Sequence, residues 1–212
     1  MKRRTLDIAF SIGGALFAAL LLVLGLVLKD QANFATDYVK DQLSEQKIFF
    51  PEEYTRGETD VADSDCLDEY IGQAVDNGPK AECFANFYIK THMMHSTEDA
   101  GYPGETYSSL GGITRALGAE LTTAMEGTDQ AAIDEAQAKV DAASSLRDTM
   151  FKGETLRGLL LTTYGFSIFG DRADLAGLIC YLAAALLFVL SVAGIAHGFL
   201  SKNANHKILA AS

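Results

Sequence analysis

An uncharged stretch from Ile8 to Leu28 constrains this chain more than any other feature of its sequence. Its 21 residues would form a helix roughly 30 Å long at about 1.5 Å per residue, which matches the hydrocarbon thickness of a bilayer. A second uncharged stretch, from Leu175 to Ala196, lies near the other end of the chain. The sequence therefore predicts two transmembrane helices, 8–28 and 175–196, that bracket the region 29–174.

Basic residues flank the two predicted spans on the same side. Because Lys and Arg concentrate in short cytoplasmic segments, we expect the segments 1–7 and 197–212 in the cytoplasm and 29–174 on the extracytoplasmic side of the cell membrane. The basic residues of these ends are Lys2, Arg3, Arg4, Lys202 and Lys207.

A cleaved signal peptide is the alternative interpretation of the N-terminus, since it also combines a basic start with an apolar run. The apolar run is longer than the roughly 7 to 15 residues of a signal core. No A-x-A pattern of small residues follows it. An uncleaved anchor therefore fits this N-terminus better.

The region between the spans is strongly acidic. It contains 12 Lys and Arg against 27 Asp and Glu, whereas the whole chain has a net charge of −11. Nucleic-acid binding and polybasic contact with anionic lipid both need clustered positive charge, so the sequence argues against both. An acidic domain suits a basic partner, although a solvated, soluble surface explains the same composition.

Hydrophobic periodicity predicts an all-α region between the spans. The first helix should continue outward on a stripe of Ala35, Val39 and Leu43 and end before Pro51. A loop over 52–65 and a short helix over 66–75, capped by Asp65 and ended by Asn77-Gly78, should follow. A helix from Pro79 then has one apolar face, before a loop over 95–105. The residues expected on that buried face are Ala81, Phe84, Ala85, Tyr88, Ile89 and His92.

Two longer periodic segments predict a helical hairpin with Gly127-Thr128-Asp129 at its turn. One stripe has Tyr107, Leu110, Thr114, Leu117, Leu121 and Ala124, and the other has Ile133, Ala136, Val140, Ala143 and Met150. The uncharged stretch 158–170 that follows is too short to span a bilayer. It is expected either at the membrane interface, with Tyr164, Phe166 and Phe169 at headgroup depth, or as a core helix of the outer domain.

Cys66 and Cys83 are the two cysteines of the outer region. Because exported compartments favour oxidation, the sequence predicts a disulfide between them. Cys180 lies within the second span, where it is expected to be a small packing residue.

The sequence His92-Met93-Met94-His95 is the best candidate metal site, since imidazole and thioether together suit copper. No third histidine lies nearby, and His92 falls on the expected buried stripe. Packed or surface side chains are therefore the alternative interpretation of His92, Met93, Met94 and His95.

Small residues recur at four-residue spacing in both spans and predict close helix packing in lipid, either between the spans or with a partner. They are Ser11, Ala15 and Ala19 in the first span, and Ala176, Cys180, Ala184, Gly194 and Gly198 in the second. The spans contain no Asp, Glu, Lys, Arg or His before His197, which argues against ion conduction by this chain alone.

Familiar catalytic patterns do not occur: there is no C-x-x-C-H, H-E-x-x-H, G-x-S-x-G or phosphate loop. The sequence therefore predicts no enzyme, no catalytic residue and no cofactor. A receptor shares the two-span layout, but only 16 residues follow Ala196, too few for a signalling domain.

The layout and the stretch Asp41–Pro51 (DQLSEQKIFFP), within FATDYVKDQLSEQKIFFP, resemble small two-span membrane proteins of actinobacteria. Some of these accompany the cytochrome bcc and aa3 complexes as accessory subunits of a respiratory supercomplex. The resemblance implies a non-catalytic role in electron transport, in which the spans contact larger integral membrane subunits. The alternative function is extracytoplasmic copper binding or delivery.

Overall fold

Helices dominate the structure, a computed structural model that describes residues 3–53 and 65–200. The one extended pairing in these ranges is an isolated antiparallel bridge between Phe49 and Ala74. The predicted all-α class is therefore confirmed. The elements are α1 (Arg3–Glu45), α2 (Asp65–Glu69), α3 (Gly78–Cys83), the π-helix η1 (Phe84–Ile89), α4 (Lys90–Asp99), α5 (Tyr107–Met125) and α6 (Gln130–Leu200).

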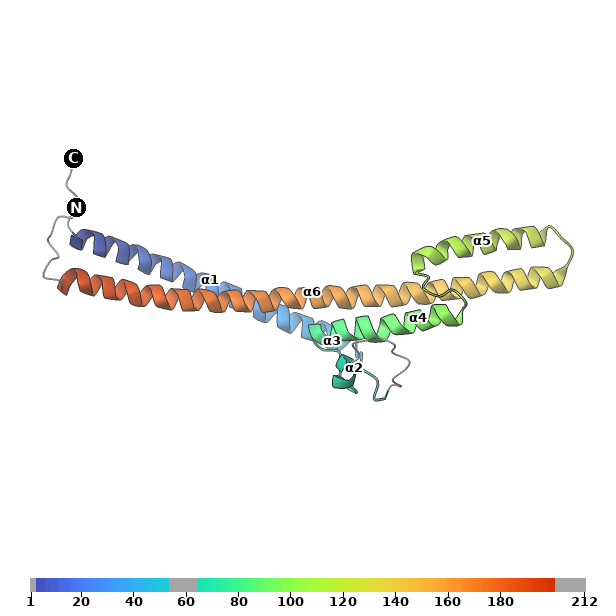
Figure 1. Cartoon of the computed structure of the whole chain (residues 1–212), viewed down its shortest axis with the longest axis horizontal. Helices are drawn as coiled ribbons and strands as arrows, with labels where there is room; N and C mark the ends of the chain where they lie inside the picture. Colours follow the sequence, from blue (N-terminus) through green and yellow to red (C-terminus); the bar gives the residue numbers. More distant parts are fainter. Residues whose placement is uncertain (1–2, 54–64, 201–212) are drawn as a thin grey trace, which may run out of the picture. The chain divides into compact units, whose positions relative to one another are not determined.

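The chain forms two compact units, which we describe separately. The span unit contains the described residues 3–38 and 167–200, and the central unit contains those of 39–166. In the span unit, α1 and the last part of α6 lie side by side and antiparallel (Figure 1). Both helices are long and apolar enough to cross a bilayer, which fits a two-span membrane protein.

The two helices of the span unit meet along a seven-residue repeat of small side chains. Buried positions of α1 recur every seventh residue, and so do those of α6. A repeat of seven corresponds to 3.5 residues per turn, which keeps one stripe of each helix facing its partner. The buried small residues are Ser11, Ala18, Gly25 and Ala32 on α1, and Gly170, Gly177, Ala184, Ser191 and Gly198 on α6.

The central unit has a larger and a smaller hydrophobic cluster. The larger one joins the end of α1 to the disulfide region, η1 and one turn of α6. The predicted outward stripe is confirmed here, because Val39 and Leu43 are buried within it. Its fully buried side chains include Leu43, Phe50, Leu67, Val75 and Leu160.

The smaller cluster lies between the antiparallel helices α5 and α6 (Figure 1), where Leu110 packs against Leu146 and Met150. The predicted hairpin is confirmed, since the side chains of both predicted stripes are buried or half-buried. Thr106 caps α5 through the backbone N–H of Ser109. Asp129 caps α6, because its side chain accepts a hydrogen bond from the N–H of Ala131 at 3.0 Å.

The predicted helix over 66–75 is wrong beyond Glu69, where α2 ends. Gly72 has a φ of +66°, which turns the chain back. Residues 73–75 then pair with 48–50: the N–H of Phe50 donates to the carbonyl of Gln73 at 2.9 Å, and the N–H of Val75 donates to that of Ile48 at the same distance. Most of the loop expected over 52–65 lies outside the described residues.

A π-helical turn changes the buried face expected after Pro79. A π-turn contains one more residue than an α-turn and rotates the helix that follows it. Ala81, Phe84, Ala85 and Ile89 are buried as predicted, whereas Tyr88 is half-buried and His92 is exposed. The buried positions that follow Ile89 are Thr91 and Thr97. The helix also continues to Asp99, so the loop expected from His95 begins later than predicted.

The stretch 158–170 is not a separate segment. It lies within α6, which is continuous from Gln130 to Leu200. The stretch contains Gly158, Gly165 and Gly170. A glycine in a helix interior costs only about 1 kcal/mol, which packing of a helix face can offset. Within the central unit, Leu160 is buried to 1% exposure in the larger cluster, so this part of α6 is a core helix there.

Candidate functional site

The small residues singled out in the sequence have different positions in the span unit. Ser11, Ala184 and Gly198 are buried between the two helices, and Ala15, Ala176, Cys180 and Gly194 are half-buried. Ala19 is exposed. Contacts with the partner helix recur every seven residues, whereas a stripe at four-residue spacing turns gradually away from that helix. The four-residue spacing therefore does not describe the helix interface.

Glycines let the backbones of the span unit approach closely. A methyl group at Gly14 would lie 2.6 Å from Ser191 Oγ, and one at Gly25 would lie 2.8 Å from the ring of Tyr181. One at Gly194 would overlap the hydroxyl of Ser11. Packing of this kind drives helix association in lipid, where burial of apolar surface does not.

A polar contact lies at each end of the apolar part of the span unit. Lys29 pairs with Asp174 next to the ends of the uncharged stretches. At the opposite ends, Asp7 lies 3.3 Å from His197 Nδ1. About 21 helical residues separate the two pairs on α1, so they are roughly 30 Å apart, the thickness of a hydrocarbon core.

An apolar groove of about 410 Å³ lies on the span unit, between α1 and α6. Ala15, Ala19 and Leu22 line it from α1, and Tyr181 and Phe188 are among the residues that line it from α6. Most of the remaining large apolar side chains of both helices are exposed, with Phe10 at 80% and Leu182 at 63%. The outer surface of the span unit is therefore suited to contact with lipid or with another apolar helix.

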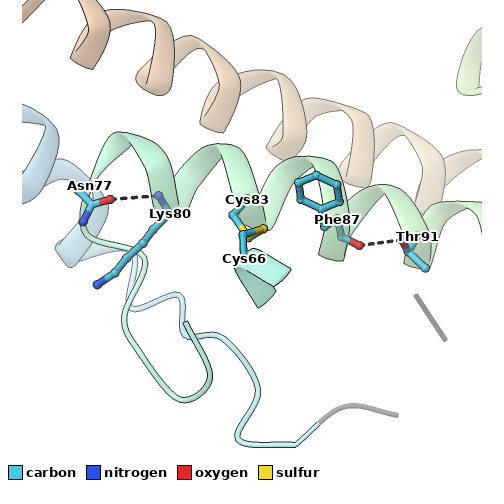
Figure 2. Close-up of a disulfide and its surroundings, with 6 residues drawn as sticks. All are labelled: Cys66, Asn77, Lys80, Cys83, Phe87 and Thr91. Carbon is cyan, nitrogen blue, oxygen red and sulfur yellow. Dashed lines mark hydrogen bonds between the residues drawn. A yellow bond between two sulfur atoms is a disulfide. The ribbon is translucent and has the colours of Figure 1, made fainter. Parts of the chain in front are cut away.

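The structure joins Cys66 and Cys83, the pair expected from the sequence, with their Cα atoms 6.1 Å apart (Figure 2). Asn77 caps α3 by accepting a hydrogen bond from the N–H of Lys80 at 3.0 Å. The disulfide ties the short helix α2 to α3 at the edge of the larger cluster. Leu67, the residue after Cys66, is fully buried there.

Side chains supply extra donors around the π-turn. Thr91 Oγ1 donates to the carbonyl of Phe87 at 2.7 Å (Figure 2), and His92 Nδ1 donates to that of Tyr88 at 3.0 Å. The His92 ring also lies 4.4 Å from the ring of Tyr88. The backbone carbonyl of Tyr88 therefore engages the Nδ1 of His92.

The candidate metal residues 92–95 do not form one site. Met93 packs against both hydrophobic clusters, whereas Met94 is 45% exposed. His95 Nδ1 lies 3.7 Å from a carboxylate oxygen of Glu98. Among the described residues, no group of three or more His, Cys, Asp or Glu is arranged to hold a metal ion.

A cleft of about 490 Å³ opens in the central unit between α4, the turn at 104–106 and α6. Its charged lining residues are Lys90, Glu105, Glu154 and Arg157. Glu154 accepts a hydrogen bond from the N–H of Tyr107 at 2.9 Å, at the start of α5. Arg157 donates to Asn86 at 2.9 Å, which fixes its guanidinium against the π-turn.

Sequence reasoning did not find this cleft, because its walls come from helices that are far apart in the chain. The one available signal is the pair Met93-Met94, since three methionines line the cleft. The seven-residue repeat of the spans was visible in the sequence, as small residues at 11, 18, 25 and 32.

The chain was also compared with known proteins. No protein-family model, curated protein or solved structure matches it.

Proposed function

We propose that this chain is a non-catalytic accessory subunit of a larger membrane complex. One observation carries the proposal: both spans lack Asp, Glu, Lys, Arg and His between the Lys29–Asp174 and Asp7–His197 contacts at their ends. Such helices offer a contact surface to the membrane and no path for an ion or a proton. The small residues of both spans are used against each other, so a partner meets the larger side chains on the outside.

The region between the spans acts in the same way, by contact. In this proposal it is extracytoplasmic, with both termini in the cytoplasm, the orientation that the basic ends favour. Its excess of 15 negative charges suits a basic protein surface, and the Cys66–Cys83 disulfide suits an oxidising compartment. The resemblance at Asp41–Pro51 points to a respiratory partner, namely subunits of cytochrome bcc and aa3 complexes.

The first test is purification from the native membrane in a mild detergent, through a small tag on the cytoplasmic tail. We expect larger integral membrane subunits in fixed ratio, together with a haem absorption spectrum. A protein that purifies alone and without pigment would refute the respiratory role. An unrelated two-span protein that carries the same tag controls for capture by the detergent micelle.

Photo-crosslinking then locates the contact. A crosslinker in place of Phe10, which is 80% exposed, should join the chain to the partner. The same group in place of Ala18, which is 4% exposed and faces α6, should give products within the chain only. Equal partner crosslinking at both positions would contradict the proposed use of the outer face.

A further inference from the structure

Exposed aromatic rings continue the surface of the span unit beyond the Lys29–Asp174 contact. Phe34 on α1 is 57% exposed, and Phe169 on α6 is 76% exposed. Tyr38, one turn after Phe34, stacks on that ring with the two centroids 5.7 Å apart. The rings of Phe34 and Phe169 therefore lie on the outer surface of the span unit, although both positions are outside the uncharged stretches 8–28 and 175–196.

Phe34 and Phe169 lie at nearly the same level along the span unit. A methyl group at Gly170 would lie 3.0 Å from the Cβ of Ala35, so these two positions face each other between the antiparallel helices. Phe34 and Phe169 are their neighbours in sequence and differ in level by only about 3 Å. Both are five positions from the Lys29–Asp174 contact, or roughly 7 Å along a helix axis.

This level corresponds to the polar layer of a bilayer. The hydrocarbon core is about 30 Å thick and the whole bilayer about 40–45 Å, so each headgroup layer is roughly 5–8 Å deep. The Lys29–Asp174 contact lies next to the ends of the uncharged stretches and so marks the edge of the hydrocarbon core. Rings roughly 7 Å beyond that edge are at headgroup level.

The residues between these rings and the uncharged stretches carry charges of both signs. A hydrocarbon core excludes such side chains, whereas zwitterionic headgroups offer partners of either sign. The charged residues are Lys29 and Asp30 on α1, and Asp171, Arg172 and Asp174 on α6. All five are exposed.

We propose that Phe34 and Phe169 lie in the phospholipid headgroup layer at this end of the spans. Aromatic side chains are suited to this layer, where one part of the ring meets lipid and the other meets water. The lipid-bound part of the chain then extends beyond residues 8–28 and 175–196 to Phe34 and Phe169. This contact is with lipid, so it does not depend on the protein partner proposed above.

Tryptophan fluorescence in vesicles tests this placement, since the chain has no Trp of its own. The full-length variants Phe34→Trp and Phe169→Trp each carry a single indole at the proposed level. They are reconstituted in phosphatidylcholine vesicles whose acyl chains carry bromine either near the headgroup or near the methyl end. We expect both variants to lose more fluorescence to bromine near the headgroup, and to emit at a shorter wavelength than indole in water.

Two further variants calibrate the result. Leu182→Trp replaces a side chain that is 63% exposed and lies eight positions inside Asp174, so bromine near the methyl end should quench it most. Phe49→Trp controls for the affinity of indole itself for membrane interfaces. Phe49 belongs to the central unit and is 58% exposed, nearly as much as Phe34, and its variant should show a water-like emission that bromine does not quench.

Three outcomes would overturn the proposal. If Phe34→Trp and Phe169→Trp behave like Phe49→Trp, these rings lie in water, where a protein partner could cover them. If bromine near the methyl end quenches them most, as in Leu182→Trp, they lie in the hydrocarbon core. If Leu182→Trp is not quenched, the spans do not cross the bilayer. Circular dichroism checks that each variant keeps its helices.

Discussion

Gly25 offers a direct test of how the span unit is held together. A Cβ at this position would lie 2.8 and 3.0 Å from ring carbons of Tyr181 and 3.2 Å from the carbonyl oxygen of Gly177. The ring can rotate, but the carbonyl is backbone and moves only with α6. Crowding of this kind costs about 1–3 kcal/mol. Replacing Gly by Ala in a helix also gains about 1 kcal/mol of helix propensity.

Gly13→Ala separates these two effects. A Cβ at Gly13 has no atom within 4 Å beyond its own helix, so this variant has the propensity gain alone. The difference between Gly25→Ala and Gly13→Ala therefore isolates the contact, and we expect Gly25→Ala to be less stable by about 1–3 kcal/mol.

Equilibrium unfolding in mixed micelles with increasing sodium dodecyl sulfate measures this difference. Fluorescent labels on Arg4→Cys and Phe199→Cys report separation of the helices. These two positions are close in the folded protein, since the Arg4 guanidinium lies 4.4 Å from the Phe199 ring. The labelled protein carries Cys180→Ala, so that only the intended thiols react. Equal unfolding midpoints for the Gly25 and Gly13 variants would refute close packing at this position.

Three further predictions concern the central unit. Phe50→Ala should lower the free energy of unfolding of the central unit by about 3–5 kcal/mol, because the Phe50 side chain is 1% exposed. Phe49→Ala is the control and should change this free energy little, because Phe49 is 58% exposed. A denaturant titration of both variants measures the difference. Replacing both disulfide cysteines by alanine should cost about 3 kcal/mol, since their separation of 17 residues closes a short loop; equal stability with and without reductant would contradict this. The Glu82 carboxylate raises the pKa of the Tyr164 hydroxyl, so Glu82→Gln should lower that pKa, measured by phenolate absorbance with Tyr164→Phe as the blank.

The periodic helices of the central unit were predictable because each has one apolar stripe and clear caps. Tyr107–Met125 follows Thr106, and Asp129 precedes α6, as local rules require. The spans were predictable for a simpler reason, which is their lack of charge. In both cases the physical cause lies within a single stretch of sequence.

Other features depend on contacts that no single stretch contains. The pairing of 48–50 with 73–75 ends α2 early, because backbone groups on two segments satisfy each other. The π-turn at Phe84–Ile89 moves His92 out of the buried face, although the spacing of apolar residues fits an unbroken α-helix. The cleft likewise requires α4 and α6 to be side by side, so its thioethers could not be grouped from sequence.

The pairing of the first and last helices has a consequence for biosynthesis. Asp7 and His197 are 190 positions apart, and Lys29 and Asp174 are 145 apart. At the roughly 5–20 residues per second of translation, α1 waits about 10–40 s for the end of α6 to be made. During that time the small-residue stripe at Ser11, Ala18 and Gly25 has no helix against it within its own chain. In a bilayer, lipid would cover this stripe until the end of α6 is made.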